Sequence, residues 1–332
     1  MILANPAKTD AVEMYVRCLV ELHRIMAAGK DDTPDAEVLR STMDSAWYQL
    51  SENDIEVVGG LSEDLYSIGV DREDPPRESV PDSLAVSLSR YFACDEVAQL
   101  LLFIRKHERE LPRVDAAVWR GYAWGRLGHP SASAEFFGES ARVEPTNVLL
   151  RVSHIGMLID CGKIDAAMPI ARSLAEKADA SSDELYTAGT VFFRAVLAQP
   201  PGEANEVLQE AVNVFQRAAS AQRPPVPDVT NAIGLYAKAY SYALVGIWMG
   251  RSCIEYNGQL ELGMCWEEMG DTDSARAAYR EAESLGIDDD LAEILLHDLD
   301  TNHPLNCRER FRQCHPRLAP STVWDFGLCA RS

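Results

Sequence analysis

The feature that most restricts the fold of this chain is a spacing of 34 residues between turns that join amphipathic helices. Gly128 and Gly162 stand 34 residues apart, and each lies in a short turn between two segments with helical periodicity. In those segments, and along almost the whole chain, apolar residues return every three or four positions. Periods of about 20 to 50 residues are typical of repeat proteins. The sequence therefore predicts an all-α protein built from successive helix pairs.

Four segments carry the repeated pattern. The segments 114–147 and 256–289 match it best, 148–181 matches it loosely, and 182–221 matches it with a turn about ten residues too long. Small residues let the two helices of a pair approach closely, and aromatic residues fill the remaining space. The residues that carry the pattern are Gly121, Trp124, Leu127, Gly128, Ser133, Phe137 and Pro145, then Gly162, Ala167 and Ala171, then Gly189, Ala211, Phe215 and Ala218, and finally Leu262, Gly263, Trp266, Gly270, Ala275, Tyr279 and Ala282.

These residues resemble the tetratricopeptide repeat (TPR) family over about residues 114–289. The resemblance implies a right-handed helical-repeat superhelix, with Trp124, Phe137, Trp266 and Tyr279 between helices. Around it we expect a small N-terminal helical bundle at 1–70, a linker at 71–81, a TPR-like repeat domain at 82–300 that starts with a helical pair at 82–110, and a C-terminal tail at 301–332.

The N-terminal bundle has clear helix start and stop signals. A first helix is expected from about Asp10 to Ala28, ended by Gly29. Pro34 suits the first position of a second helix, and Ser51 with Asp54 suits the start of a third. The apolar residues expected to pack in this bundle are Trp47, Tyr48, Leu50, Ile55, Val58, Leu61, Leu65, Tyr66 and Ile68.

The charge balance argues against two classes of partner. The chain has 31 basic and 52 acidic residues, a net charge of −21. Nucleic acids and anionic membranes attract clustered lysine and arginine, so neither is an expected partner. The N-terminus lacks the pattern of an export signal, and eight scattered cysteines do not indicate a disulfide framework. We therefore expect a cytoplasmic protein with reduced cysteines.

The C-terminal tail differs in charge from the segment before it. Residues 301–332 have a net charge of +3, whereas residues 251–300 have a net charge of −11. The tail could therefore clamp onto that acidic segment, or it could be solvated. It also contains weak candidates for a metal site, although their spacing is not that of a zinc knuckle or ribbon. These candidates are His303, Cys307, Cys314 and His315.

The resemblance to TPR proteins also implies a binding surface, because the first helix of each unit lines a concave groove in that family. The expected groove combines aromatic, aliphatic and arginine side chains, which suits an amphipathic helix or apolar segment of a partner protein. Alternatively, these side chains face an internal helix at 230–250 or the tail. The groove residues are Val118, Tyr122, Arg126, Val152, Ile159, Tyr186, Thr190, Phe193, Arg194, Leu260, Met264 and Glu267.

The function expected from these features is non-catalytic protein–protein interaction as a scaffold or adaptor, without a cofactor. One alternative is an all-α enzyme, because Asp31, Asp32 and Asp35 match the DDxxD motif that holds magnesium against a diphosphate. Pro34 interrupts the helix that this motif requires, and an acidic helix start explains the same residues. A peptide-sensing regulator of transcription is a second alternative, but residues 1–110 are net acidic and lack a basic recognition helix.

Overall fold

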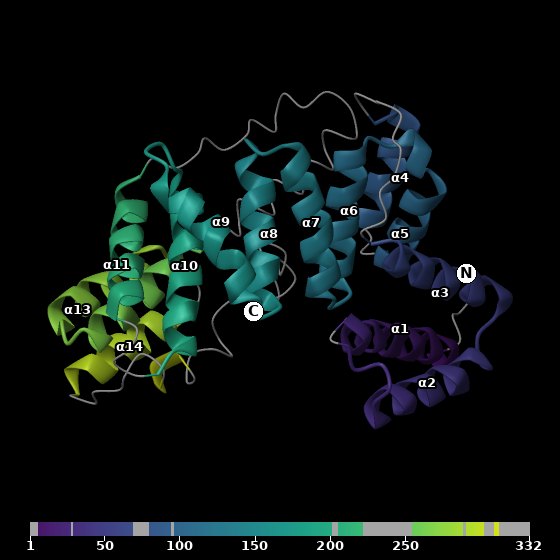
Figure 1. Ribbon diagram of the computed structural model, residues 1–332, viewed down its shortest axis with the longest axis horizontal. Coiled ribbons are helices and arrows are strands. Elements are labelled where there is room, and N and C mark those ends of the chain that lie inside the picture. Colours follow the sequence, from purple (N-terminus) through teal and green to yellow (C-terminus); the bar gives the residue numbers. More distant parts are fainter. Residues whose placement is uncertain are drawn as a thin grey trace. The chain divides into compact units, whose positions relative to one another are not determined.

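The computed structural model describes residues 6–27, 29–68, 80–93, 96–200, 205–221, 254–287, 290–301 and 309–311, and every regular element within these ranges is helical (Figure 1). The described residues form two compact units. Unit 1 runs to Glu144 and unit 2 begins at Pro145. The division therefore falls inside the predicted repeat domain. The predicted linker lies outside the described residues except for Val80 and Pro81.

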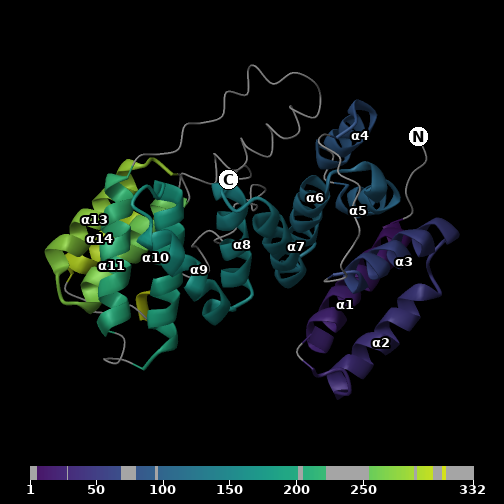
Figure 2. The same ribbon diagram turned by 45° about the horizontal axis from the view of Figure 1, so that its top comes forward.

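Unit 1 begins with three helices, α1 (Pro6–Ala27), α2 (Pro34–Trp47) and α3 (Glu52–Tyr66). Helix α1 packs against both of the others, as Figure 2 shows. It starts a few residues earlier than expected and is followed by Gly29, whose positive φ of 67° stops a helix. The expected capping signals are confirmed: Pro34 opens α2, and Ser51 and Asp54 form a capping box at α3.

The expected packing of the N-terminal apolar residues is only partly correct. Val58, Leu61 and Leu65 are buried in α3. Trp47, Tyr48 and Tyr66 were expected in the same core but are 37%, 87% and 56% exposed. Tyr48 lies beyond the end of α2. Trp47 and Tyr66 are the last residues of their helices, and each ring contacts α1 but stays partly open to solvent: the ring centroids of Trp47 and Tyr15 are 5.7 Å apart, and those of Tyr66 and His23 are 6.1 Å apart.

The second half of unit 1 contains α4 (Asp82–Ala93), α5 (Val97–Lys106), the short 3₁₀ helix η1 (Glu108–Glu110), α6 (Arg113–Arg126) and α7 (Pro130–Val143). The helical pair expected at 82–110 is confirmed. Helix α5 packs on α3, α4 and α6. It buries Val97, Leu100, Leu101 and Ile104.

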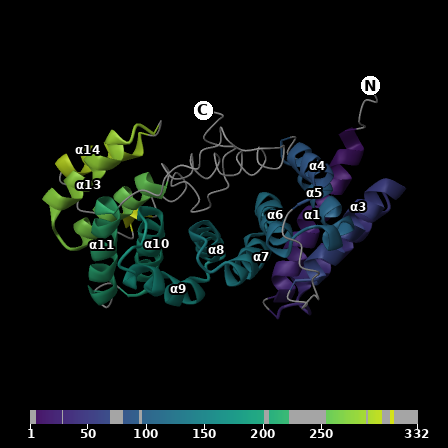
Figure 3. The same cartoon turned by 90° about the horizontal axis from the view of Figure 1, so that it is seen from above.

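Unit 2 contains α8 (Val148–Asp160), α9 (Ile164–Glu176), α10 (Ser182–Ala198), α11 (Asn205–Ser220), a helix at 254–268, α13 (Thr272–Ser284), α14 (Leu291–Asp300) and a helical turn at 309–311. Consecutive helices pack on each other, including α8 with α9, α10 with α11, and α13 with α14 (Figure 3). The predicted helix at 230–250 lies outside the described residues. No helix in the described ranges is long and apolar enough to cross a membrane.

Three helix pairs share one close contact between a glycine and an aromatic ring. A Cβ atom added to Gly121 would lie 2.9 Å from the Phe137 ring, and a Cβ on Gly189 would lie 2.5 Å from Phe215. The same construction on Gly263 gives 2.2 Å to Tyr279. Real Cβ atoms do not approach a ring so closely, so glycine is required for the helices to pack in this way. The small-against-aromatic packing expected from the sequence is confirmed in these three pairs.

In the α8–α9 pair, the large residue stands on the first helix and the small residue on the second, the reverse of the other three pairs. Ile155 and Ala171 stand 34 residues after Gly121 and Phe137, and both are fully buried. A large residue on the first helix and a small one on the second fill similar space. This exchange explains why the sequence of 148–181 matches the repeat pattern loosely.

The turns and the remaining aromatics follow the pattern with one difference. Gly128, Gly162 and Gly270 adopt positive φ angles of 76°, 68° and 79° in the turns between paired helices. Trp124 and Tyr279 are fully buried as expected, as is Phe137 in the contact above. Trp266 is only partly buried. Its side chain is therefore less enclosed than the other three.

Candidate functional site

The predicted groove residues of α10 and of helix 254–268 lie against each other in unit 2. The Tyr186 ring packs so closely on helix 254–268 that a Cβ added to Gly258 would lie 2.3 Å from it. Gln259 donates a hydrogen bond of 2.9 Å from Nε2 to the Tyr186 hydroxyl. Leu260 and Met264 are fully buried in the same helix. These contacts therefore join two helices of the chain.

A buried carboxylate, Glu261, links the polar residues of this interface. The Thr190 hydroxyl donates to Glu261 Oε2 over 2.7 Å, and Arg194 Nη2 lies 3.3 Å from Oε1. Burial raises the pKa of Glu261, although the charge of Arg194 and the hydrogen bond from Thr190 act in the opposite direction. Glu261 was not among the predicted site residues, because it does not stand at one of the groove positions of the repeat pattern. Its place in an apolar helical segment was the signal that could have indicated it.

Two residues of the C-terminal tail, Arg310 and Phe311, lie on this part of unit 2. The Arg194 guanidinium stacks over the Phe311 ring at 4.1 Å from the centroid. The Phe193 ring meets Phe311 edge to face, with centroids 5.8 Å apart and an interplanar angle of 73°. Phe193 is fully buried, and Arg194 is mostly buried. Phe311 therefore has a cation on one side and an aromatic ring on another.

Arg310 is fully buried and is held by two carboxylates. Its Nε donates to Glu267 Oε2 over 3.0 Å, and its Nη1 donates to Asp298 Oδ2 over 2.6 Å. The second oxygen of Glu267 accepts a 2.6 Å hydrogen bond from the Tyr279 hydroxyl. Burial alone would lower the pKa of Arg310, but Glu267 and Asp298 outweigh it and raise that pKa. We call Phe193, Arg194, Glu267 and Asp298 together the Arg–Phe seat.

The contact of Arg310 with Glu267 and Asp298 bears on two expectations from the sequence, the clamp of the basic tail and the exposure of the predicted groove. Glu267 and Asp298 belong to the acidic segment 251–300, and Arg310 belongs to the basic tail, so the clamp between them is present at this residue. For Phe193, Arg194 and Glu267, the chain itself covers the predicted groove, which is the alternative that the sequence left open. The tail metal candidates His303, Cys307, Cys314 and His315 lie outside the described residues.

The other predicted groove residues lie on α6 and α8. On α6, Tyr122 is buried, whereas Val118 and Arg126 are half-buried. On α8, Val152 and Ile159 are buried, with 4% and 8% of their surface exposed. Of this group, Val118 and Arg126 offer the most surface to a partner.

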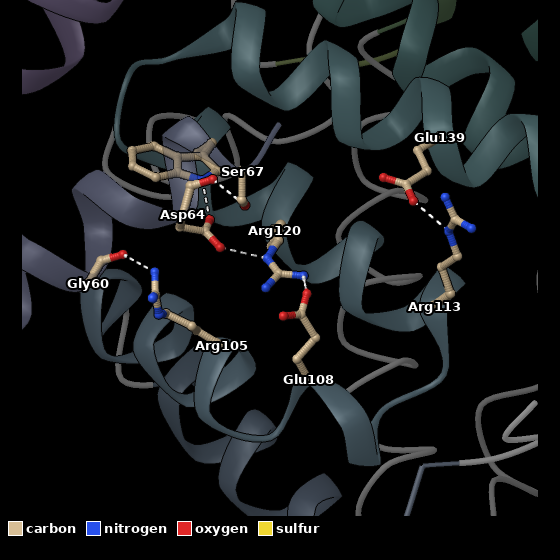
Figure 4. A network of polar contacts seen from close by, with 9 residues as sticks. Gly60, Asp64, Ser67, Arg105, Glu108, Arg113, Arg120 and Glu139 are labelled. Carbon is tan, nitrogen blue, oxygen red and sulfur yellow. Dashed lines mark hydrogen bonds and ion pairs between the residues drawn. The ribbon is translucent and has the colours of Figure 1, made fainter. Parts of the chain in front are cut away.

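Unit 1 holds a second buried polar network, shown in Figure 4, that the sequence did not indicate. Asp64 of α3 accepts hydrogen bonds of 2.8 Å from Arg120 Nε and from Trp124 Nε1 of α6. Arg120 Nη1 also lies 3.0 Å from Glu108 Oε1. Both carboxylate oxygens of Asp64 are thus used inside the protein. This network joins α3 to α6 inside unit 1.

The aspartates of the DDxxD-like segment do not converge on a site. Asp31 and Asp32 are exposed in the turn before α2, and Asp35 is exposed in its first turn. Thr33 caps α2 by accepting from the Ala36 amide. Within the described part of the chain, no group of three or more His, Cys, Asp or Glu side chains could hold a metal ion. The acidic helix start accounts for these residues.

Comparisons of the chain with protein-family models, with curated proteins and with solved structures find no match. The class of protein is therefore defined by its fold alone. This is an all-α protein in which successive helix pairs pack through small residues and aromatic rings.

Proposed function

We propose that this chain is a non-catalytic scaffold or adaptor that binds a segment of another protein on a TPR-like groove. The observation that carries the proposal is the Arg–Phe seat. Predicted groove residues of α10 and helix 254–268 hold an arginine and a phenylalanine that come from a distant part of the chain. A surface that binds a short segment of its own chain has the chemistry to bind such a segment from a partner.

The repeated glycine–aromatic contacts support the TPR part of this proposal. They occur at corresponding places in the α6–α7 and α10–α11 pairs and in the pair formed by helix 254–268 and α13. Turn glycines with positive φ follow the first helix in three of the four pairs. A right-handed superhelix would align the first helices along one concave face. The expected occupant is an amphipathic helix or apolar segment of a protein, and the proposed function requires no cofactor.

The test compares two aspartate substitutions of valine in adjacent helices. Val118 is half-buried on α6 at a predicted groove position, whereas Val143 is 51% exposed at the end of α7. Each purified variant and the parent chain would be used to capture proteins from a lysate of the source organism, followed by quantitative mass spectrometry. We expect Val118→Asp to lose specific partners that the parent and Val143→Asp retain. Equal recovery by all three folded proteins, checked by circular dichroism, would refute binding through this groove.

A further inference from the structure

We propose that the Arg–Phe seat recognises an arginine followed by an aromatic residue in a partner protein, and that Arg310 and Phe311 occupy the seat until such a segment displaces them. This inference rests on the proposed function, because it assigns a ligand chemistry to one stretch of the groove. It also means that, in the free chain, Arg310 and Phe311 block the seat. Three properties of the seat support it: its acidic pocket, its aromatic surface and its independence from the residues that fill it.

The acidic pocket is matched to a guanidinium group. Arg310 donates from Nε to Glu267 and from Nη1 to Asp298, so two carboxylates contact two different nitrogens of one planar guanidinium group. A lysine has a single terminal nitrogen and cannot reproduce this geometry. Arg310 has no surface exposed to solvent, so each of these charge-assisted hydrogen bonds is shielded from water. The pocket therefore selects arginine over lysine.

The neighbouring surface is matched to an aromatic ring. The Arg194 guanidinium lies 4.1 Å from the centroid of Phe311, and Phe193 contacts that ring at an interplanar angle of 73°. Cation–π and edge-to-face contacts need a π system, so an aliphatic side chain would lose both. Because positions 310 and 311 are adjacent, the seat reads two consecutive residues.

The seat is held in place by residues that are not part of the tail. Arg194 pairs with the buried Glu261, which also accepts the hydrogen bond from Thr190. Glu267 accepts from Tyr279 of α13 in addition to Arg310. These contacts do not involve Arg310 or Phe311 and remain when the two residues leave. A vacant seat would therefore keep its shape for an incoming segment.

The chain's own segment has an advantage over any free ligand. A segment of the same chain competes for the seat as an intramolecular ligand, at an effective concentration that a free peptide must exceed. A partner segment with the same two residues must therefore compete against Arg310 and Phe311. Removing both side chains should raise the affinity of the seat for an added peptide without any change in the seat itself.

The experiment uses the full chain and a peptide copied from it. The probe is a fluorescent synthetic peptide with the sequence of residues 305–316 and serine at both cysteine positions. Its binding is measured by anisotropy to the parent, to the double variant Arg310→Ala/Phe311→Ala, and to Arg276→Ala. Arg276 serves as the matched control because it forms ion pairs with Asp273 and Asp300 in the same region, outside the seat.

We expect the double variant to bind the peptide at least tenfold more tightly than the parent or Arg276→Ala does. A peptide with lysine in place of the arginine at position 310, or with leucine in place of the phenylalanine at position 311, should bind the double variant at least tenfold more weakly. A folded double variant that does not bind the peptide overturns the proposal. A double variant that loses its helical circular dichroism also overturns it, because the tail residues would then be part of the fold.

Milder variants and the capture experiment separate the remaining outcomes. Arg310→Gln keeps most of the side-chain volume, so it should open the seat in part and bind the peptide measurably; absence of binding by this folded variant counts against the proposal. If the peptide binds as expected while Val118→Asp leaves partner capture unchanged, the ligand chemistry stands and the proposed groove function fails. If capture depends on Val118 but the peptide does not bind, only the ligand chemistry assigned to the seat fails.

Discussion

The two units each bury an arginine between two carboxylates, yet the two arginines come from different kinds of chain segment. In unit 1, Arg120 meets Asp64 and Glu108, and its own helix α6 packs on both α5 and α7. In unit 2, Arg310 meets Glu267 and Asp298, and it belongs to the C-terminal tail beyond α14. Under the proposed exchange, the same chemistry serves as a fixed core contact in unit 1 and as a reversible docking contact in unit 2.

The difference lies in what happens when one partner is removed. Arg120 is anchored in the middle of a 14-residue helix and cannot reach water without disrupting unit 1. In the proposed exchange, Arg310 leaves its pocket and the two carboxylates become accessible to solvent. A charge that stays buried without a partner costs several kcal/mol, whereas a charge that returns to water costs little. Stability measurements on the two arginine sites should separate these cases.

The largest effect is expected for Asp64→Ala in unit 1. This change removes the main partner of Arg120 and the acceptor of the Trp124 indole N–H, and both groups remain buried. We expect unit 1 to lose about 3–5 kcal/mol of unfolding free energy. The measurement is urea denaturation combined with hydrogen exchange of α3 and α6.

The adjacent residue supplies the control for that measurement. Glu63 pairs with Arg105, but its side chain is 65% exposed, and Glu63→Ala should cost less than about 1 kcal/mol. If Asp64→Ala cost no more than Glu63→Ala, the network of unit 1 would not be a fixed core contact, and the contrast between the units would disappear.

A smaller loss is expected when alanine replaces the glycines that touch aromatic rings. In Gly263→Ala the new Cβ would lie 2.2 Å from Tyr279, whose hydroxyl is bonded to Glu267, so the ring resists displacement. We expect a cost of about 2–3 kcal/mol in unit 2. In Gly121→Ala the distance to Phe137 is 2.9 Å, and the cost in unit 1 should be lower.

Gly59 is the matched control, since it lies within α3 and a Cβ added there would meet no neighbouring side chain or helix within 4 Å. Gly59→Ala should stabilise the helix by up to about 1 kcal/mol, because alanine has the higher helix propensity. Thermal unfolding of the three variants tests the ranking. A Gly263→Ala protein as stable as Gly59→Ala would show that the helices of this pair can separate without cost.

The helices and their close contacts could be predicted from the sequence, because they depend on local patterns. The capping box of Ser51 and the positive φ of Gly128 follow from residue type alone, and the approach of Gly263 to Tyr279 follows from the repeat pattern. The exposure of Tyr48 was not predictable in this way, since periodicity does not show where a neighbouring helix ends.

The candidate site was predictable only in part. The repeat pattern selected Phe193, Arg194 and Glu267 as groove residues, and the charge contrast suggested that the basic tail could contact the acidic segment. Neither observation pairs Arg310 with Asp298, because such a long-range pair depends on tertiary packing. For the same reason, the sequence left open whether Tyr186, Leu260 and Met264 face a partner or the interior of the chain, where the structure buries them.

Two acidic residues in the first turns of helices should show opposite pH effects in the two units. In unit 1, burial and the nearby charge of Glu144 raise the pKa of Asp115 to about 6. Ionised Asp115 therefore destabilises the fold, and this cost develops as pH rises from about 4 to 6. Asp115→Asn should stabilise unit 1 by about 1–2 kcal/mol at pH 7 and have little effect at pH 4.

In unit 2, Glu184 has the opposite shift. Burial acts to raise its pKa, but the hydrogen bonds from Ser181 and the charges of Arg151 and Lys177 outweigh burial and lower it. Ionised Glu184 therefore stabilises the fold above the ordinary glutamate pKa, and that stability is lost as pH falls through the lowered value. Glu184→Gln should destabilise unit 2 at pH 7, with a difference that shrinks on acidification. Denaturation curves from about pH 2 to 7 test both variants, and parallel pH profiles would contradict the assignment.

Only a small loss of stability is expected for Arg310→Ala, and this variant tests the comparison between the units most directly. Without Arg310, Glu267 keeps its hydrogen bond from Tyr279, and the carboxylate of Asp298 is already 32% exposed. Departure of the segment lets water reach Glu267, so little uncompensated charge remains buried. We expect a cost of about 1 kcal/mol in unit 2, well below the value for Asp64→Ala, together with faster hydrogen exchange in helix 254–268. A loss as large as that of Asp64→Ala would mean that Arg310 is a core residue like Arg120, and that the seat does not exchange its occupant.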